Sequence, residues 1–137
     1  MSAKHPLRRR FALRLLSTVD CSHLILQVPG VYTPQAYRLP FGPAFSAVLR
    51  QPDSWHDSDA WDCLATFRGH LLIVEASGDT VIPRTLVDKL HASATQARSR
   101  QRLLLGGAGH QLAAHWQRHP AAASHYRQLL ARFLLQP

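Results

Sequence analysis

The feature of this chain that most restricts its fold is a continuous apolar run, Leu71-Leu72-Ile73-Val74. A strand with one face in water alternates apolar and polar residues, whereas an unbroken apolar strand is typical of one buried on both faces. Residues 23–28 form a second run, which is too short for a typical helix and ends at Pro29-Gly30. Residues 103–105 form a third, which ends at two glycines. We therefore expect three buried strands.

Stretches with helical periodicity accompany these runs. Apolar residues recur at helical spacing near residues 8–18, 84–95 and 121–134, and Pro83 suits the first turn of the second of these helices. Strands that alternate with helices predict right-handed crossovers and a parallel sheet. The expected fold class is therefore α/β, with about three parallel strands flanked by helices.

Residues 31–67 differ from the rest of the chain. Four prolines punctuate this segment, and seven of the eleven aromatic residues lie in it. Short helices are expected to occupy part of it, including one from Asp59 to Phe67 with Ser58 as its N-cap.

Length and composition set the broad class. The 137 residues are enough for one ordinary domain, which we expect to span residues 1–137. Hydrophobic residues make up 46% of the chain and charged residues 18%, which excludes a wholly disordered protein. No apolar run approaches the ~20 residues that a membrane-spanning helix needs. Two cysteines are too few for a disulfide framework, so a reducing, cytoplasmic location is the default expectation.

The charge balance is strongly basic. Sixteen basic side chains, fourteen of them Arg, stand against eight acidic ones, which gives a net charge of +8. Such a surface attracts anions, including nucleic acid, without specifying a fold. The Arg-rich, acid-free start from Met1 to Ser17 also overlaps the description of a mitochondrial presequence, the alternative being a first helix with a basic polar side.

Two titratable residues follow the predicted strands. Asp79 lies in the turn after residues 71–74, and His110 lies in the loop after residues 103–105. The carboxyl ends of parallel strands meet at one edge of a sheet, so we expect the two side chains within roughly 2.6–3.2 Å of each other. A carboxylate that holds an imidazole in its productive tautomer is the Asp–His half of a nucleophilic triad. Taken singly, Asp79 is explained as a turn residue and His110 as a helix cap.

Longer stretches around these residues resemble a known family. Residues 72–83, LIVEASGDTVIP, resemble the acid loop of α/β-hydrolases, and residues 103–110, LLLGGAGH, resemble their histidine loop. Residues 24–32, LILQVPGVY, are similar to the strand that follows the nucleophile helix in that family. The resemblance implies a partial α/β-hydrolase fold corresponding to its C-terminal half. It also implies that Asp79 is the triad acid and His110 the base of an esterase, thioesterase or peptidase.

One part of the family pattern is absent. The nucleophile elbow, G-x-S-x-G, does not occur in this sequence. It would fall near residues 4–9, where the chain reads KHPLRR, and the nearest serine, Ser2, has no preceding strand. The enzyme hypothesis is therefore a serine hydrolase whose Ser comes from outside this chain, as in a truncated or mis-started gene product or half of a two-chain hydrolase. The alternatives are a non-catalytic interaction module derived from a hydrolase and a basic nucleic-acid-binding protein.

The family also places a cap over its acyl pocket, and residues 31–67 occupy the corresponding position. The alternative is plain packing under a long loop. No cofactor or metal ion is expected, and the expected substrate is a small ester-type molecule.

Other groupings suggest binding sites but have plainer explanations. The glycine-rich residues 106–109 could cradle a phosphate, but no Lys-Ser/Thr follows and a third Rossmann glycine is missing. Arg98, Arg100 and Arg102 could contact nucleic acid, but alternate residues entering a strand more often form a solvated side.

Two groups of possible metal ligands occur as well. His115 and His119 stand one helical turn apart, but without a third ligand we expect them to be solvent-exposed histidines. His56, Asp57 and Asp59 could bind a hard cation, although an acidic helix N-terminus explains the aspartates.

The small predicted sheet suggests a partner. The strand at residues 23–28 would expose an apolar edge, and natural proteins pair or cover such edges. We expect either a homodimer through this edge or a complex with a separately encoded N-terminal half, with no membrane partner and with nucleic acid a less favoured one.

Overall fold

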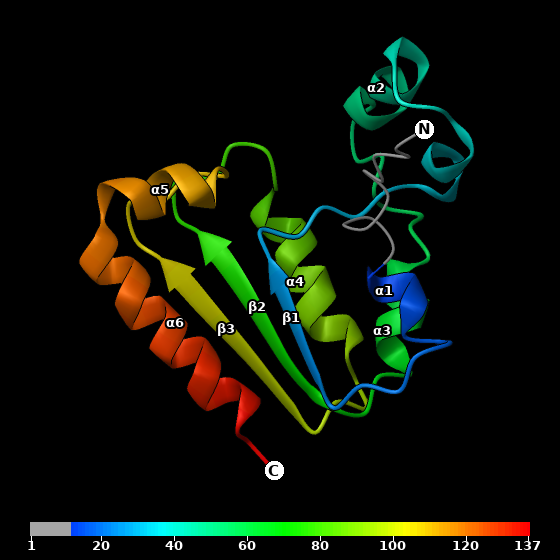
Figure 1. Ribbon diagram of the computed structural model, residues 1–137. Coiled ribbons are helices and arrows are strands. Elements are labelled where there is room, and N and C mark those ends of the chain that lie inside the picture. Colours follow the sequence, from blue (N-terminus) through cyan, green and yellow to red (C-terminus); the bar gives the residue numbers. More distant parts are fainter. Residues whose placement is uncertain (1–11) are drawn as a thin grey trace, which may run out of the picture.

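The computed structural model describes residues 12–137. The predicted helix near residues 8–18 is therefore described only in its second half, and residues 4–9 and Ser2 lie outside the described part. Three parallel strands form one sheet in the order β1-β2-β3 (Figure 1). Their bounds are His23–Gln27 for β1, His70–Ala76 for β2 and Ser99–Leu105 for β3. The predicted three-stranded parallel sheet is confirmed, but the expectation that all three strands are buried is wrong for β3, an edge strand with no buried residue.

The central strand is the most deeply buried part of the molecule. The four residues from Leu71 to Val74 are each at most 2% exposed. Alternate side chains of β2 point to opposite faces, so Leu71 and Ile73 join one apolar cluster while Leu72 and Val74 join another. Both faces must therefore be covered.

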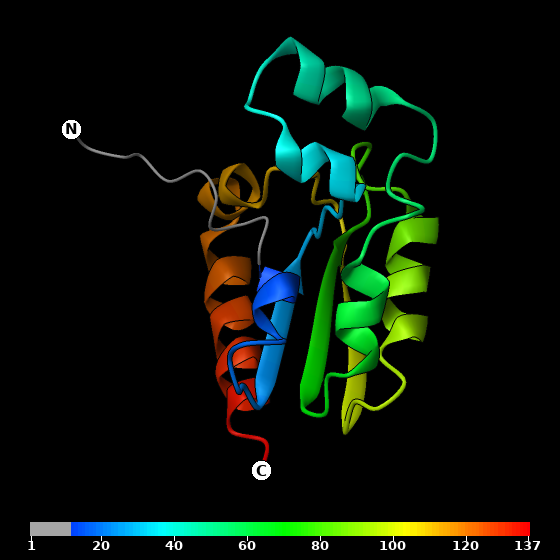
Figure 2. The same ribbon diagram turned by 90° about the vertical axis from the view of Figure 1, so that its right-hand side faces the viewer.

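Helices cover the two faces of the sheet (Figure 2). On one side the core contains residues of α3 and α4. Leu13 of the short α1 and Leu16, which follows that helix, pack against this core. On the other side α6 supplies the aromatic residues that pack on β2, and α5 precedes it. The bounds are Ala12–Leu15 for α1, Ala60–Ala65 for α3, Arg84–Ser93 for α4, Leu112–Arg118 for α5 and Pro120–Leu134 for α6. The α/β architecture is consistent with a partial α/β-hydrolase fold.

Residues 32–50, which we call the lobe, stand apart from these layers. The lobe contains the 3-10 helix η2 (Pro34–Arg38) and α2 (Pro43–Arg50), and it projects beyond the carboxyl ends of the strands (Figures 1 and 2). Its own small cluster consists of buried Ala36, Phe45 and Val48. The short helices predicted within residues 31–67 are confirmed.

The helix predicted from Asp59 to Phe67 is present in shorter form as α3. The N-cap residue of this helix is Asp59, one position after the predicted Ser58, whose hydroxyl accepts a hydrogen bond from the amide of Ala60 at 3.2 Å. Unlike the lobe, α3 packs beside α4 in the helix layer. Gly69 then turns the chain into β2, and glycine is required there because a Cβ atom would overlap the carbonyl oxygen of Ser22.

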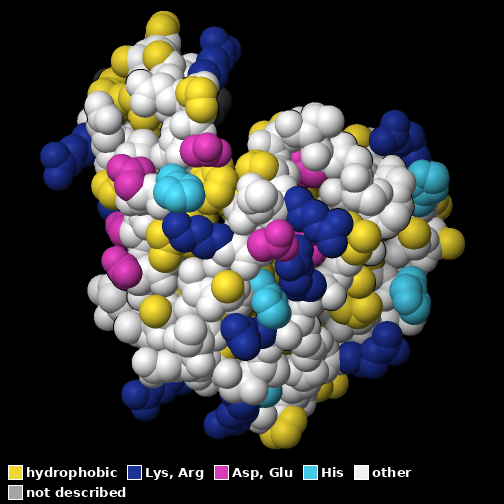
Figure 3. Space-filling model, turned by 180° about the vertical axis from the view of Figure 1, so that it is seen from behind, with side chains coloured by type: hydrophobic (Ala, Val, Ile, Leu, Met, Phe, Trp, Pro, Cys, Tyr) yellow, Lys and Arg dark blue, Asp and Glu magenta, His cyan; other side chains and the backbone are white. Residues whose placement is uncertain are grey.

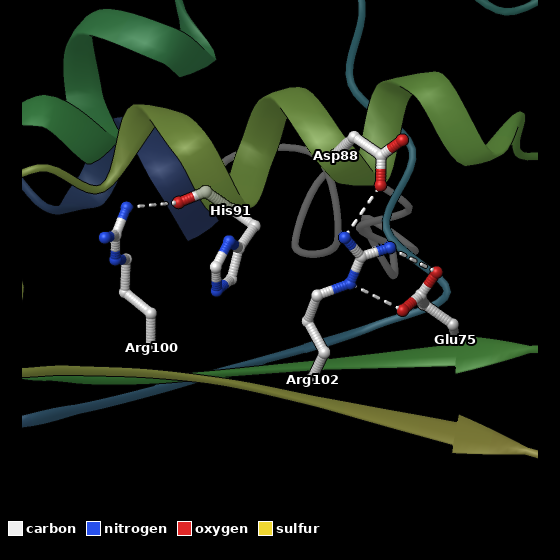
Figure 4. A network of polar contacts seen from close by, with 5 residues as sticks. All are labelled: Glu75, Asp88, His91, Arg100 and Arg102. Atoms are coloured by element: carbon white, nitrogen blue, oxygen red, sulfur yellow. Dashed lines mark hydrogen bonds and ion pairs between the residues drawn. The ribbon is translucent and has the colours of Figure 1, made fainter.

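The prediction that Arg98, Arg100 and Arg102 form a solvated side is wrong for Arg102, which lies within β3. Its guanidinium donates two 2.8 Å hydrogen bonds to the carboxylate of Glu75 and one of 2.7 Å to Asp88 (Figure 4). These bonds, first of all those to Glu75, raise the pKa of Arg102. Arg100 instead donates to the backbone carbonyl of His91. Arg100 and Arg102 contact residues of α4 because both lie on the face of β3 that α4 covers.

Basic side chains are distributed over the molecule and do not form one continuous patch on the face shown in Figure 3, where acidic side chains interrupt them near its centre. Within residues 12–137, no helix combines the length and apolar character required to cross a membrane.

Candidate functional site

Asp79 lies in the loop that follows β2, where its carboxylate has two separate tasks. One oxygen, Oδ1, accepts hydrogen bonds from the backbone amides of Val81 at 2.8 Å and Ile82 at 3.0 Å. This is the turn role that the sequence allowed as the simpler explanation. The second oxygen, Oδ2, takes no part in this turn and is available for another hydrogen bond.

The loop after β3 is tied to the Asp79 loop by hydrogen bonds. The amide of Gly78 donates to the carbonyl of Ala108 at 2.8 Å, and the amide of Gly107 donates to the hydroxyl of Ser77 at 2.9 Å. Gly107 has φ of +73°, a backbone conformation that favours glycine. These contacts hold His110 beside Asp79.

Asp79 and His110 are in direct contact. His110 Nδ1 lies 3.1 Å from Asp79 Oδ2, within the range that the sequence predicted. The Asp79 side chain is 6% exposed and that of His110 is 34% exposed. Burial alone would raise the pKa of Asp79, but the amide of Ile82, His110 and the amide of Val81 together bring its pKa below the ordinary value.

An ionised Asp79 can only accept a hydrogen bond from its partner, so His110 carries its hydrogen on Nδ1. The other ring nitrogen, Nε2, then holds a free lone pair. Within residues 12–137, the imidazole ring of His110 has no hydrogen bond other than the one to Asp79. The pair is therefore chemically equipped to accept a proton at Nε2.

A cleft of about 890 Å³ lies next to His110. It lies between the lobe and the carboxyl ends of the strands, and His110 is one of its lining residues while Asp79 is not. Tyr32, Tyr37 and Phe41 line it from the lobe. A cavity of this size is typical of small-molecule sites.

One polar side chain in the cleft escaped the sequence analysis. Gln27, at the end of β1, accepts a 2.9 Å hydrogen bond from the hydroxyl of Tyr126 and lines the cleft. Burial raises the pKa of Tyr126 to about 12, so its hydroxyl remains protonated and can donate this bond. The only available signal was the single polar residue within the apolar run 24–28.

The aspartates near α3 serve structural contacts. Asp59 forms an ion pair with Arg14 at 2.7 Å, and Asp57 accepts a hydrogen bond from Thr33 at 3.1 Å. Across the described residues, no three His, Cys, Asp or Glu side chains gather as a metal site would require. His56, the remaining member of the predicted group, contributes its backbone carbonyl to hydrogen bonds from Trp61 and Lys89.

The prediction that His115 and His119 are both solvent-exposed is wrong for His115. His115 is 6% exposed, and its ring lies 4.7 Å from that of His119, which is exposed. Burial, then the charges of His119 and Arg118, lower the pKa of His115. The cause of the burial is α5, which the sequence did not predict and which turns His115 inward.

The glycine-rich loop makes internal contacts that oppose its role as a phosphate cradle. The amide of Gly107 is bonded to Ser77, and the amide of Ala108 donates to the carbonyl of Leu105. Two of the backbone donors that would face a phosphate are therefore already engaged.

Comparison with known proteins finds similar solved structures, and one of them is described below. No protein-family model and no curated protein sequence matches the chain. A solved structure described as a predicted CIB-like hydrolase from Thermoplasma acidophilum is 15% identical, with a TM-score of 0.42. The match covers 82% of this chain and 51% of the other, so this chain spans about half the length of that structure.

Proposed function

We propose that Asp79 and His110 are the acid and the base of an α/β-hydrolase-like site for carboxylic esters, thioesters or peptides. The observation that carries this proposal is the 3.1 Å contact between His110 Nδ1 and Asp79 Oδ2. Support also comes from the position of the two residues after neighbouring parallel strands, the usual place for ligands in such sheets.

The chemistry follows from the tautomer. Asp79 holds the Nδ1–H group of His110, and Nε2 takes the proton of a hydroxyl nucleophile as its oxygen attacks the substrate carbonyl. Asp79 stabilises the resulting imidazolium. The imidazolium then gives this proton to the leaving group as the bond between the carbonyl carbon and the leaving group breaks. A water molecule releases the acyl group by the same proton route.

The nucleophile is assigned to a residue from outside this chain. No Ser, Thr or Cys of residues 12–137 is hydrogen-bonded to His110. β1 pairs only with β2 in this part of the chain, so its other edge is the place where we propose that a strand carrying the nucleophile pairs. The proposed source of that strand is a separately encoded N-terminal half.

An activated ester tests the proposal even without a serine, because a free imidazole nitrogen can itself attack such an ester. The purified chain is assayed with 4-nitrophenyl acetate beside His110→Ala and, as a matched control, the exposed His119→Ala. We expect His110→Ala to lose turnover at least ~100-fold relative to the parent chain, and the control to retain it. Equal rates for the parent chain and His110→Ala would contradict the proposal.

The lack of a nucleophile at His110 among the described residues favours a second candidate, a non-catalytic binding module. This alternative predicts that ligands occupy the cleft without turnover. Ligand binding that persists in His110→Ala, combined with no ester hydrolysis by any variant, would favour it.

A further inference from the structure

The cleft beside His110 is lined mainly by apolar and aromatic side chains. Apart from His110, the only side chains among the described lining residues that belong to a type charged near pH 7 are Arg14 and Asp59. Phe41 and Val81, which also line it, are 49% and 61% exposed, so apolar groups face an entering ligand. A ligand that fills this space exchanges water for apolar contact.

The two charged residues form an ion pair through one oxygen of Asp59, Oδ2, while the buried Oδ1 has no hydrogen-bond partner among the described residues. Asp59 Oδ2 accepts hydrogen bonds from Arg14 Nε at 2.8 Å and from its terminal nitrogen at 2.7 Å. The Arg14 guanidinium carbon also lies 3.9 Å from the centre of the Tyr37 ring, in a cation–π contact. One edge of the cation is thereby bound by the carboxylate and one face by the aromatic ring, and its charge is balanced within the wall of the cleft.

The neutral charge of the cleft lining contrasts with the basic character of the whole chain. The whole chain has a net charge of +8, which favours anionic ligands over its surface. Asp59 balances the positive charge of Arg14, which lines the cleft. The cleft therefore does not share the preference of the rest of the surface for anionic ligands.

We propose that the cleft selects uncharged ligands with an apolar or aromatic acyl group, and that Asp59 is the residue that sets this selectivity by neutralising Arg14. The acyl part of the statement rests on the proposed function, whereas the selectivity for uncharged apolar ligands does not. Removal of the Asp59 charge leaves Arg14 free to pair with an anion, which converts the cleft to one that accepts carboxylates or sulfonates.

Two fluorescent probes with one aromatic framework test the selectivity without catalysis. N-phenyl-1-naphthylamine is neutral, and 1-anilinonaphthalene-8-sulfonate carries one negative charge. We expect the parent chain to bind the neutral probe at least about five-fold more tightly, and Asp59→Asn to tighten sulfonate binding by a similar factor with the neutral probe unchanged. Displacement of one probe by the other checks that they share a site.

Further variants separate the charge effect from a loss of structure. Arg14→Gln combined with Asp59→Asn should abolish the gain in sulfonate binding. Asp20→Asn, at an exposed position that does not line this cleft, should leave both affinities unchanged. Circular dichroism and the thermal midpoint show that each variant is folded.

The results have distinct meanings for the two proposals. A parent chain that prefers the sulfonate, or an Asp59→Asn variant with an unchanged ratio of affinities, overturns the selectivity proposal. The expected probe binding without any ester turnover would leave the selectivity standing and count against the hydrolytic function. Retention of neutral-probe binding in His110→Ala would show that binding does not require the catalytic pair.

Discussion

The lobe has a much smaller buried core than the sheet and its covering helices. In the sheet, a central strand with four residues at most 2% exposed is enclosed by apolar clusters on both faces. The lobe has three buried hydrophobic residues, Ala36, Phe45 and Val48, and reaches the rest of the chain through loops. The well-packed region holds Asp79 and His110 in place, while the lightly packed region provides one wall of the cleft. The catalytic pair that we propose and one wall of the cleft thus belong to regions that are packed to different extents.

The largest effect is expected from the centre of the sheet. Ile73→Ala should lower the free energy of unfolding by about 2–5 kcal/mol, because Ile73 is fully buried and its neighbours cannot close the resulting cavity. Urea unfolding followed by circular dichroism measures the loss. Leu104→Ala, at a residue 59% exposed on β3, is the control and should change the stability little. Equal effects of the two substitutions would show that the centre of the sheet is not the stable core.

The ion-pair network on the α4 side should give a smaller loss. Glu75→Gln removes the charge from a side chain that is 13% exposed and accepts two hydrogen bonds from Arg102, so we expect a loss of about 1.5–3 kcal/mol. Asp88→Asn, at a side chain 53% exposed, should cost less than about 1 kcal/mol because water screens that pair. Chemical unfolding of both variants at low and high salt tests the ranking, which a larger loss for Asp88→Asn would refute.

Asp79→Asn should lower stability by about 1 kcal/mol at neutral pH, since the amide keeps acceptor capacity but loses the charge. The pKa of Asp79 is lower in the folded protein than its ordinary value. The stabilisation it provides is therefore complete above the unfolded-state pKa and is lost as the pH falls through the folded-state pKa. The stability difference between the parent and Asp79→Asn should shrink on acidification from pH 7 to pH 3, as measured by urea titrations. A difference that stays constant over this range would contradict the assignment, and Asp53→Asn serves as the control.

The smallest effect on global stability is expected in the lobe. Phe45→Ala removes a buried side chain from the small cluster, so the lobe should open locally while the sheet stays folded. Hydrogen exchange measured by mass spectrometry should show faster exchange in residues 34–50 and unchanged protection in residues 70–76. Faster exchange in β2 as well would mean that the lobe and the sheet unfold as one unit.

The strands and the site loops were predictable because their signals are local. Unbroken apolar runs located β1 and β2, and the residues directly after two strands identified Asp79 and His110. β3 is longer than its apolar run, because Ser99–Arg102 is polar and belongs to an edge strand whose arginines bond to α4 and β2.

Features that depend on distant contacts were not predictable. The Arg14–Asp59 pair joins positions 45 residues apart, and neither residue lies in a pattern that indicates the other. The burial of His115 depends on α5, whose sequence, LAAHWQR, has no clear apolar stripe. Gln27 acquires its place in the cleft through Tyr126 of α6, 99 positions away.

The central claim is that Asp79 fixes His110 with its proton on Nδ1 and its lone pair on Nε2. Long-range ¹H–¹⁵N NMR of the ¹⁵N-labelled chain at neutral pH distinguishes the two imidazole tautomers directly. Our account predicts an Nδ1–H tautomer for His110 in the parent chain and a loss of this tautomer preference in Asp79→Asn. An Nε2–H tautomer in the parent chain, or the same tautomer ratio in both proteins, would contradict it.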